Sequence, residues 1–281
     1  MRNLSHIAQI RRYNMEYLKC FEKEKSLKTS DGKEILVFNF NSPQNDDILD
    51  EWARHFRDNY RTLAEVDDEI IGTGKTRDDY YINDVFPDAH TAPGPSTRVG
   101  DFCELMLADY IEYIRYYYVP RTRYCRKINR NMSPNGSDVL GFKMDSTSSL
   151  KDEVLVIEVK GGSDPKANYK GFTRLNDALI GSEKDIARYS ESLNAIKRRL
   201  LDIGDKENAK LIARFQNKTD RPYLVKFGAA AVLTNALYDP SEYVNVSTSD
   251  NSAENLELIL IHNNDLKSLI SELYWRAANV N

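Results

Sequence analysis

The sequence has 281 residues, of which 41% are apolar and 29% charged, with a formal net charge of −4. Proteins that coat nucleic acid without sequence preference are usually strongly basic, so this class is disfavoured, although a local basic patch can still hold DNA. No apolar run approaches the ~18 residues that span a bilayer, and the start of the chain shows no export signal. The three cysteines (Cys20, Cys103 and Cys125) lie far apart, which excludes a disulfide framework and favours a cytoplasmic protein without membrane association.

The first part of the chain is predicted to contain a strand and a helix. Residues 32–41 alternate apolar and polar side chains, as a strand does, and residues 48–66 carry apolar side chains at helical spacing. The prolines and glycines of residues 90–100 predict a connection. We therefore expect an N-terminal α/β extension over residues 1–95, which could dock a partner, and a core domain over residues 96–281.

The core domain is predicted to alternate helices and strands. Residues 98–118 have the pattern of a helix that ends before Pro120, and an Asn135-Gly136 pair predicts a hairpin turn. We expect strands at residues 122–129, 138–144, 153–160, 222–233 and 256–262, helices at about 182–203 and 206–217, and a last helix capped by Asn264 or Asp265. This order predicts an α/β fold with a mixed central sheet flanked by helices.

The clearest chemical signal is the segment VLVIEVKGG at residues 154–162. Because side chains alternate faces along a strand, Glu158 and Lys160 share one face at the end of a buried apolar run. Asp138 opens the preceding strand and could lie within a few ångströms of Glu158, where two carboxylates repel unless a cation lies between them. Only four histidines occur, so a metal site would be built from carboxylates, which suit Mg²⁺. Lys160 could then stabilise phosphate charge or help to deprotonate the attacking water.

Further site residues are expected in the helix at residues 98–118 and in the basic segment that follows it. Glu104 lies at the edge of the apolar stripe of the helix RVGDFCELML, where it could overlook the metal or simply face solvent, and Asp101 could be the relevant acid instead. A basic run is the candidate contact for DNA phosphates, although a solvated charged face would look the same; its members are Arg121, Arg123, Arg126, Lys127 and Arg130.

The order of a helix with an acid, then Asp138, then Glu158-Val159-Lys160, then another helix resembles the PD-(D/E)xK nuclease superfamily over residues 98–233. The resemblance implies that Asp138, Glu158 and the main-chain carbonyl of Val159 bind Mg²⁺, for which Mn²⁺ could substitute, and that Lys160 acts at the nucleophilic water. This sequence departs from the motif in having Ser137, not proline, before Asp138.

The segments RVGDFCELML, GSDVLGF and VLVIEVKGG also resemble the HamA family, the nuclease effectors of the Hachiman anti-phage defence system. This resemblance implies a metal-dependent DNA endonuclease that acts beside a helicase partner, HamB. Two alternatives involve the same residues. One is a restriction- or repair-type endonuclease with the same core, and the other is a catalytically inert interaction module in which Glu158 and Lys160 form a structural ion pair.

Overall fold

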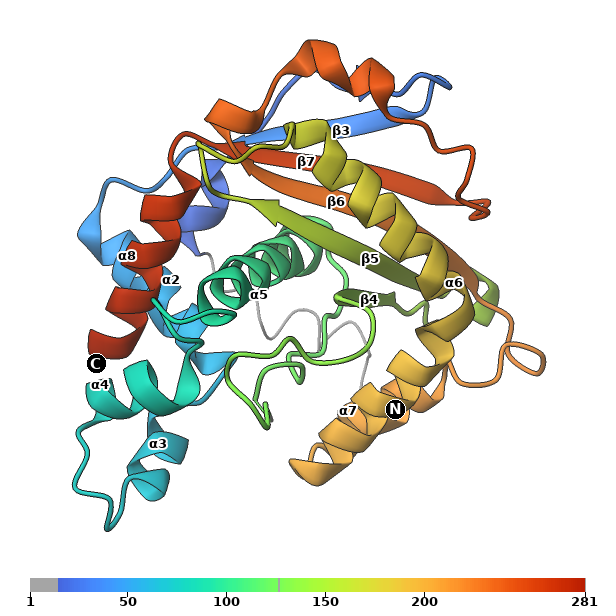
Figure 1. Ribbon diagram of the computed structural model, residues 1–281. Helices are drawn as coiled ribbons and strands as arrows, with labels where there is room; N and C mark the ends of the chain where they lie inside the picture. The colour runs from blue at the N-terminus through green and yellow to red at the C-terminus, as the bar shows by residue number, and fades with distance from the viewer. Residues whose placement is uncertain (1–14, 126, 281) are drawn as a thin grey trace.

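In the computed structural model, which describes residues 15–125 and 127–280, a mixed sheet is flanked by helices, as the sequence predicts (Figure 1). The strands are β1 (Phe21–Lys23), β2 (Leu27–Lys28), β3 (Glu34–Phe40), β4 (Val139–Lys143), β5 (Glu153–Gly162), β6 (Leu224–Thr234) and β7 (Leu256–Asn263). The α-helices are α2 (Asp46–Asp58), α3 (Leu63–Glu69), α4 (Arg77–Tyr80), α5 (Gly94–Asp109), α6 (Gly171–Asp202), α7 (Lys206–Ala213) and α8 (Leu266–Asn279).

The strand order in the sheet is β1-β3-β7-β6-β5-β4, and β2 also pairs with β3. The four central strands β3, β7, β6 and β5 run parallel, whereas β1, β2 and β4 pair antiparallel with their neighbours. Parallel strands of this kind are covered on both faces and read as nearly continuous apolar runs. The burial of every residue from Val154 to Val159 in β5 fits this rule.

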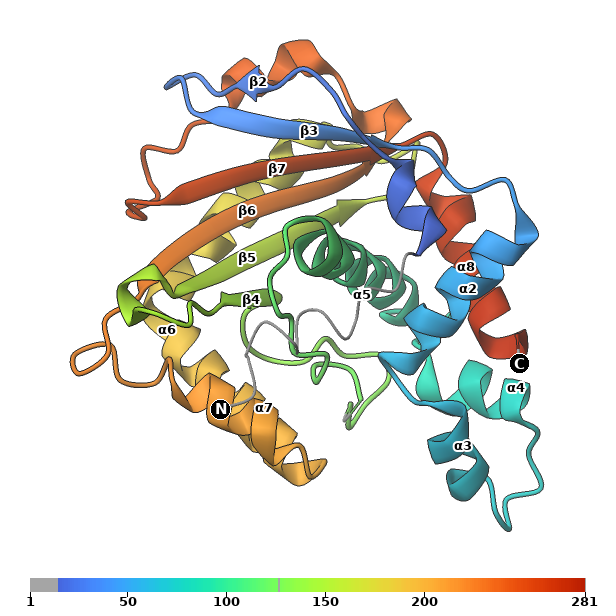
Figure 2. The ribbon, with the colours of Figure 1, turned by 180° about the vertical axis from the view of Figure 1, so that it is seen from behind.

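Helices cover both faces of the sheet, and alternate residues of β5 contribute to different cores. Leu155, Ile157 and Val159 pack in the cluster that includes α5, α2 and α8. Val154 and Val156 pack instead against α6 and α7. Figure 2 shows α5 in front of the sheet and α6 behind it. Because Glu158 and Lys160 follow the even-numbered residues, their side chains emerge on the α6 face.

One predicted strand and several helix bounds are wrong. Within residues 122–129, the described part forms turns and loop and no strand, because its basic side chains bind carboxylates of α5. The predicted helix at 48–66 is two helices, because Thr62 and Glu65 form a reciprocal cap that starts α3. The helix predicted at 182–203 begins eleven residues earlier, at Gly171.

The helix predicted at 98–118 also has different ends. α5 begins at Gly94, inside the predicted connection, and after Asp109 the chain makes one π-helical turn, Tyr110–Ile114. Tyr116 then has a φ of 59°, which reverses the chain well before Pro120. The strands β3, β4, β5, β6 and β7 agree with prediction to within two residues, and the last helix, α8, begins where predicted, with Asp265 as its cap.

The N-terminal residues complete the same sheet as the later ones, because β3 pairs in parallel with β7 along Ile35–Asn39 and Leu258–His262. The boundary between residues 95 and 96 stays a prediction. Among the described helices, none has the length and apolar character that crossing a membrane would require.

Candidate active site

The register of β4 and β5 brings two acids together at the end of the sheet. The antiparallel ladder ends at the pair Val139–Ile157, so Asp138 lies beside Glu158, just past the last rung. The main-chain N–H of Val159 donates to Oδ2 of Asp138 at 3.0 Å. This bond fixes the Asp138 carboxylate against the backbone of β5.

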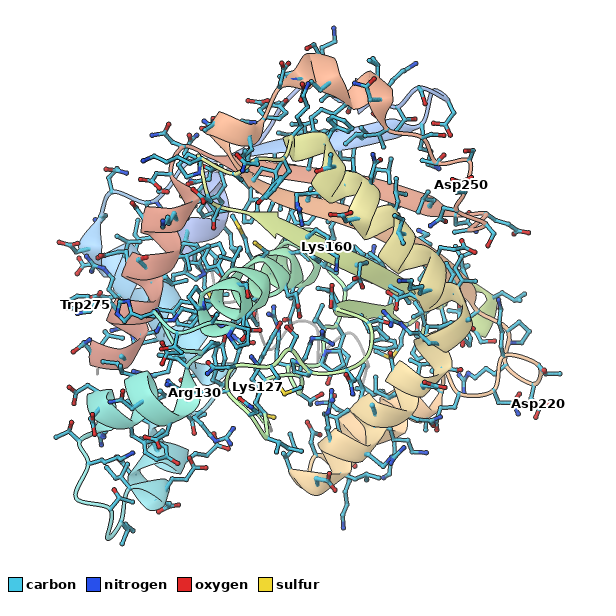
Figure 3. All side chains as sticks on the ribbon, in the orientation of Figure 1. Lys127, Arg130, Lys160, Asp220, Asp250 and Trp275 are labelled. Atoms are coloured by element: carbon cyan, nitrogen blue, oxygen red, sulfur yellow. The ribbon has the colours of Figure 1, made fainter. Side chains whose placement is uncertain are left out.

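Lys160 and Glu158 form a close pair on the α6 face of β5. The Nζ atom of Lys160 donates to Oε1 of Glu158 at 2.5 Å. The Glu158 side chain is almost fully buried, whereas the Lys160 side chain is 34% exposed. Figure 3 shows Lys160 on β5 between α5 and α6. Lys160 is therefore the more exposed member of this pair.

An open cleft of about 580 Å³ gives access to this end of the sheet, and its lining includes Glu104, Asp138, Glu158, Val159 and Lys160. The structure thus brings together the four side chains that were predicted as catalytic. Asp101, the alternative acid, does not line the cleft. It is buried beside Tyr60 and Lys127, whose hydroxyl and ammonium groups both donate to its Oδ2 atom.

Arg123 lies between two of the acids. Its Nε donates to Oε2 of Glu104 at 2.7 Å and its Nη2 to Oδ1 of Asp138 at 2.8 Å. Nη1 donates at 2.8 Å to the carbonyl oxygen of Ser137. The hydroxyl of Tyr124 also donates to Glu104. The acids of α5 and β4 are therefore held together by a cation from the loop that joins these two elements.

Burial and like charges shape the electrostatics of the cleft. Burial raises the pKa of Asp138 well above its ordinary value, the charge of Glu104 raises this pKa further, and Arg123 opposes both effects. Burial lowers the pKa of Lys160, but the hydrogen bond to Glu158 and the negative charges of Glu158, Asp138 and Glu104 together outweigh burial, so the pKa of Lys160 is raised overall. Lys160 is therefore a cation at neutral pH, suited to stabilising negative charge and not to acting as a free base.

The helix α6 supplies site residues that sequence analysis missed. Gly181 packs directly on Glu158, where a Cβ atom would lie 2.5 Å from Cγ and 2.6 Å from Oε1 of that residue. Asp185 is fully buried and accepts hydrogen bonds from the Ser137 hydroxyl at 2.9 Å and from Nε of Arg188 at 2.7 Å. A glycine within an otherwise helical pattern was the signal that could have pointed to this contact.

The residues present fit a magnesium ion with few protein ligands. Within the described ranges, no three or more His, Cys, Asp or Glu side chains form a complete metal cage. However, Mg²⁺ usually takes only one or two carboxylates and keeps several waters. Asp138 and Glu158 adjoin each other, and Oε2 of Glu158 is buried without a hydrogen-bond partner in the described structure. A buried, unsatisfied carboxylate oxygen of this kind suits a cation ligand.

The predicted DNA-binding run is largely engaged within the protein. Arg121 binds Asp109 and Glu112, Lys127 binds Asp101, and Arg130 binds Asp88. Lys127 and Arg130 lie near each other and apart from Lys160 (Figure 3), and Arg126 lies outside the described residues. Contact of this run with DNA phosphates stays a prediction, and it would require these ion pairs to be shared or broken.

Comparison with known proteins identifies the family. A family model for HamA matches residues 15–277, which is nearly the whole chain and includes the cleft and all the strands of the sheet. A search of curated proteins found no match. The chain therefore belongs to the HamA family.

Proposed function

We propose that this chain is a Mg²⁺-dependent DNA endonuclease with a PD-(D/E)xK-type core, and the nuclease component of a Hachiman anti-phage defence system. The observation that carries the proposal is the meeting of Glu104, Asp138, Glu158 and Lys160 in one open cleft at the end of β4 and β5. Membership of the HamA family supports the defence role. An acid pair beside a lysine, reached through a cleft, is suited to phosphodiester hydrolysis.

Each residue has a distinct role in this proposal. Asp138, Glu158 and the main-chain carbonyl of Val159 would hold the metal ion, which would supply Lewis-acid activation of a water molecule and of the scissile phosphate. Lys160, a cation at the open side of the cleft, orients the water and stabilises the negative charge that develops on the phosphate. Asp138 is kept in place by the N–H of Val159.

Glu104 and Arg123 are positioning residues in the same scheme. Glu104 reaches the cleft from α5 and is bound by Arg123 and Tyr124. Arg123 in turn holds Asp138, so it links the helix to the first acid of the sheet. These contacts limit the movement of Asp138 and keep its carboxylate next to Glu158.

The first prediction concerns Lys160. Lys160→Ala should abolish metal-dependent cleavage of plasmid DNA by the purified chain, whereas its urea unfolding curve should stay close to that of the wild type, because a partly exposed ion pair contributes only about 0–1 kcal/mol. Cleavage is measured in Mg²⁺ or Mn²⁺ beside an EDTA control. Lys226→Ala is the matched control, because Lys226 forms a similar pair with Glu153 on the neighbouring strand.

Full activity of the Lys160→Ala protein would refute the proposed site. If the wild-type chain alone does not cut, the assay is repeated with the helicase HamB, the partner that we propose to restrain or license the nuclease. Absence of cleavage in both settings would leave the inert interaction module as the better interpretation. Mn²⁺ binding measured by electron paramagnetic resonance, compared with Glu158→Gln, tests the metal site without relying on activity.

A further inference from the structure

Two arginines of α6 face the cleft, and the roles proposed above do not use them. Arg174 and Arg188 line the same cleft as Lys160. Gly181 lies midway between them, seven residues from each. At about 3.6 residues per turn, a spacing of seven is close to two full turns, so these three residues share one helix face. Because Gly181 packs on Glu158, that face is the one turned toward the acids.

Arg174 lines the cleft in contact with Tyr169. Its guanidinium carbon lies 4.0 Å from the centroid of the Tyr169 ring, an arrangement typical of a cation–π interaction. Nη1 of Arg174 lies 3.2 Å from Asp177 of the same helix. Nε is buried, and no described residue accepts a hydrogen bond from it. The side chain is thus oriented by an aromatic ring but is 28% exposed, so part of its guanidinium, which has five N–H donors, is open to a ligand.

Arg188 is fixed next to the acids. Asp185 accepts its Nε at 2.7 Å and is itself held by the Ser137 hydroxyl. Nη2 lies 3.8 Å from Oε2 of Glu158, which is too far for a hydrogen bond. The side chain of Arg188 is 39% exposed. A guanidinium has five N–H donors, so these contacts leave part of the group available to a ligand in the cleft.

We propose that Arg174 and Arg188 bind two phosphate groups of one DNA strand that lies along α6. The proposal rests on the proposed nuclease function and names the surface that holds its substrate. Fourteen residues of α-helix span about 21 Å, so the two guanidinium groups are spaced to bind phosphates of one strand that are several nucleotides apart. One phosphate would bind at Arg188, beside Glu158, and the other at Arg174.

Charge considerations favour this surface over the basic run. The chain has a net charge of −4, and the acids of the cleft repel phosphate, so a DNA strand needs cations close to them. Arg123 and Lys160 bind the acids themselves, and Arg121, Lys127 and Arg130 are paired outside the cleft. By contrast, Arg174 pairs with Asp177 at 3.2 Å and Arg188 pairs with Asp185 at 2.7 Å, and both of these acids lie on α6 itself. Within the described residues, neither arginine has another ion-pair partner closer than 3.5 Å.

The test is DNA binding without cleavage. Fluorescence anisotropy of a labelled 30-nucleotide DNA, single-stranded and duplex, is measured in EDTA over a series of KCl concentrations. Arg174→Gln and Arg188→Gln should each weaken binding and reduce the slope of log affinity against log salt by about one, and the double variant by about two. Arg188→Lys keeps the charge and should retain most of the slope. Arg198→Gln is the control, because Arg198 is exposed on α6 and does not line the cleft.

The outcomes separate this inference from the proposed function. If the double variant binds DNA with wild-type affinity and slope, or if the wild-type chain binds neither form of DNA, the α6 surface is not the binding site. If the variants lose affinity and salt dependence as expected but the wild type cleaves DNA in Mg²⁺ neither alone nor with HamB, the nuclease proposal fails and the binding surface stands. Urea unfolding of each variant shows whether a weaker affinity comes from loss of the fold.

Discussion

At the scale of single residues, Arg123 decides the charge balance of the cleft. Glu104 and Asp138 come from different elements, and both side chains are at most 10% exposed. Two buried carboxylates without a cation would be costly, because burial removes the water that stabilises each charge. Arg123 meets both acids and a main-chain carbonyl at once, as the planar guanidinium allows. A divalent ion would have to share the acids with this arginine.

Gly181 leads to a prediction about the position of Glu158. A Cβ atom at residue 181 would overlap the Glu158 side chain at 2.5–2.6 Å, so Gly181→Ala must displace the carboxylate. We expect DNA cleavage to fall at least tenfold. The free energy of unfolding should fall by about 0–2.5 kcal/mol, since overpacking costs about 1–3 kcal/mol and alanine recovers about 0.5–1 kcal/mol of helix propensity. Cleavage rate and urea unfolding are measured together.

The neighbouring exposed residue gives the control for this prediction. Ile180 is 59% exposed on α6, so Ile180→Ala changes the same turn of the helix without touching Glu158, and it should cleave like the wild type. A Gly181→Ala protein that cleaves at the wild-type rate would show that the packing of α6 does not set the geometry of the site.

Asp101 leads to a prediction about pH. Burial raises the pKa of Asp101 to about 7, although Lys127 acts in the opposite direction. At a pH between about 4, the ordinary pKa of an aspartate, and about 7, Asp101 is protonated in the folded state but ionised in the unfolded state. Because the folded state then binds more protons, the contribution of Asp101 to the free energy of unfolding falls as pH rises. We therefore expect the free energy of unfolding of the wild type, minus that of Asp101→Asn, to fall from pH 5 to pH 8. Urea unfolding at several pH values measures this difference.

A residue outside the cleft provides the comparison for the pH series. Asp58 is half exposed, and burial raises its pKa to a smaller extent. The stability difference for Asp58→Asn should therefore depend less on pH over the same interval. A difference between wild type and Asp101→Asn that does not change with pH would contradict the assigned ionisation of Asp101.

At the scale of elements, the sequence predicts β5 and its charged end well. An unbroken apolar run identifies a central strand, and the alternation of side chains puts Glu158 and Lys160 on one face. The hairpin predicted at Asn135-Gly136 does not form, because the described part of residues 122–129 holds no strand and β4 pairs with β5. It is the antiparallel pairing of β4 with β5 that brings Asp138 to Glu158. The charged end of β5 can nevertheless be located from the amino-acid sequence alone.

The elements that were not predicted correctly depend on contacts between distant parts of the chain. Residues 122–129 have a composition compatible with a strand, but Arg123 and Lys127 bind acids of α5 and hold the segment as a loop. The predicted helix at 182–203 missed the first eleven residues of α6, which begin with Gly171. Gly171 packs against the main-chain carbonyl of Leu237, and it has no side chain that could contribute to a helical pattern. Propensity and periodicity do not register such tertiary contacts.

At the scale of the whole molecule, the residues before and after the predicted boundary share one core. The ring of Trp52 in α2 lies 5.8 Å from that of Phe102 in α5, and the ring of Phe56 lies 4.9 Å from that of Tyr274 in α8. β3 protects the outer edge of β7 through a parallel ladder. The strands that carry the cleft are thus supported by a sheet that begins in the N-terminal part.

This sharing predicts that residues 96–281 do not fold alone. Without β3, the apolar strand β7 becomes an exposed edge, which favours aggregation, and each large apolar side chain that loses its cover forfeits about 1.5–3 kcal/mol. We expect the 96–281 fragment to aggregate or to lack a cooperative thermal transition, as measured by size-exclusion chromatography and circular dichroism. A chain lacking only residues 1–14 retains β3 and should behave like the full chain. A monomeric 96–281 fragment with a sharp transition would instead show that this part of the chain folds independently of the N-terminal part.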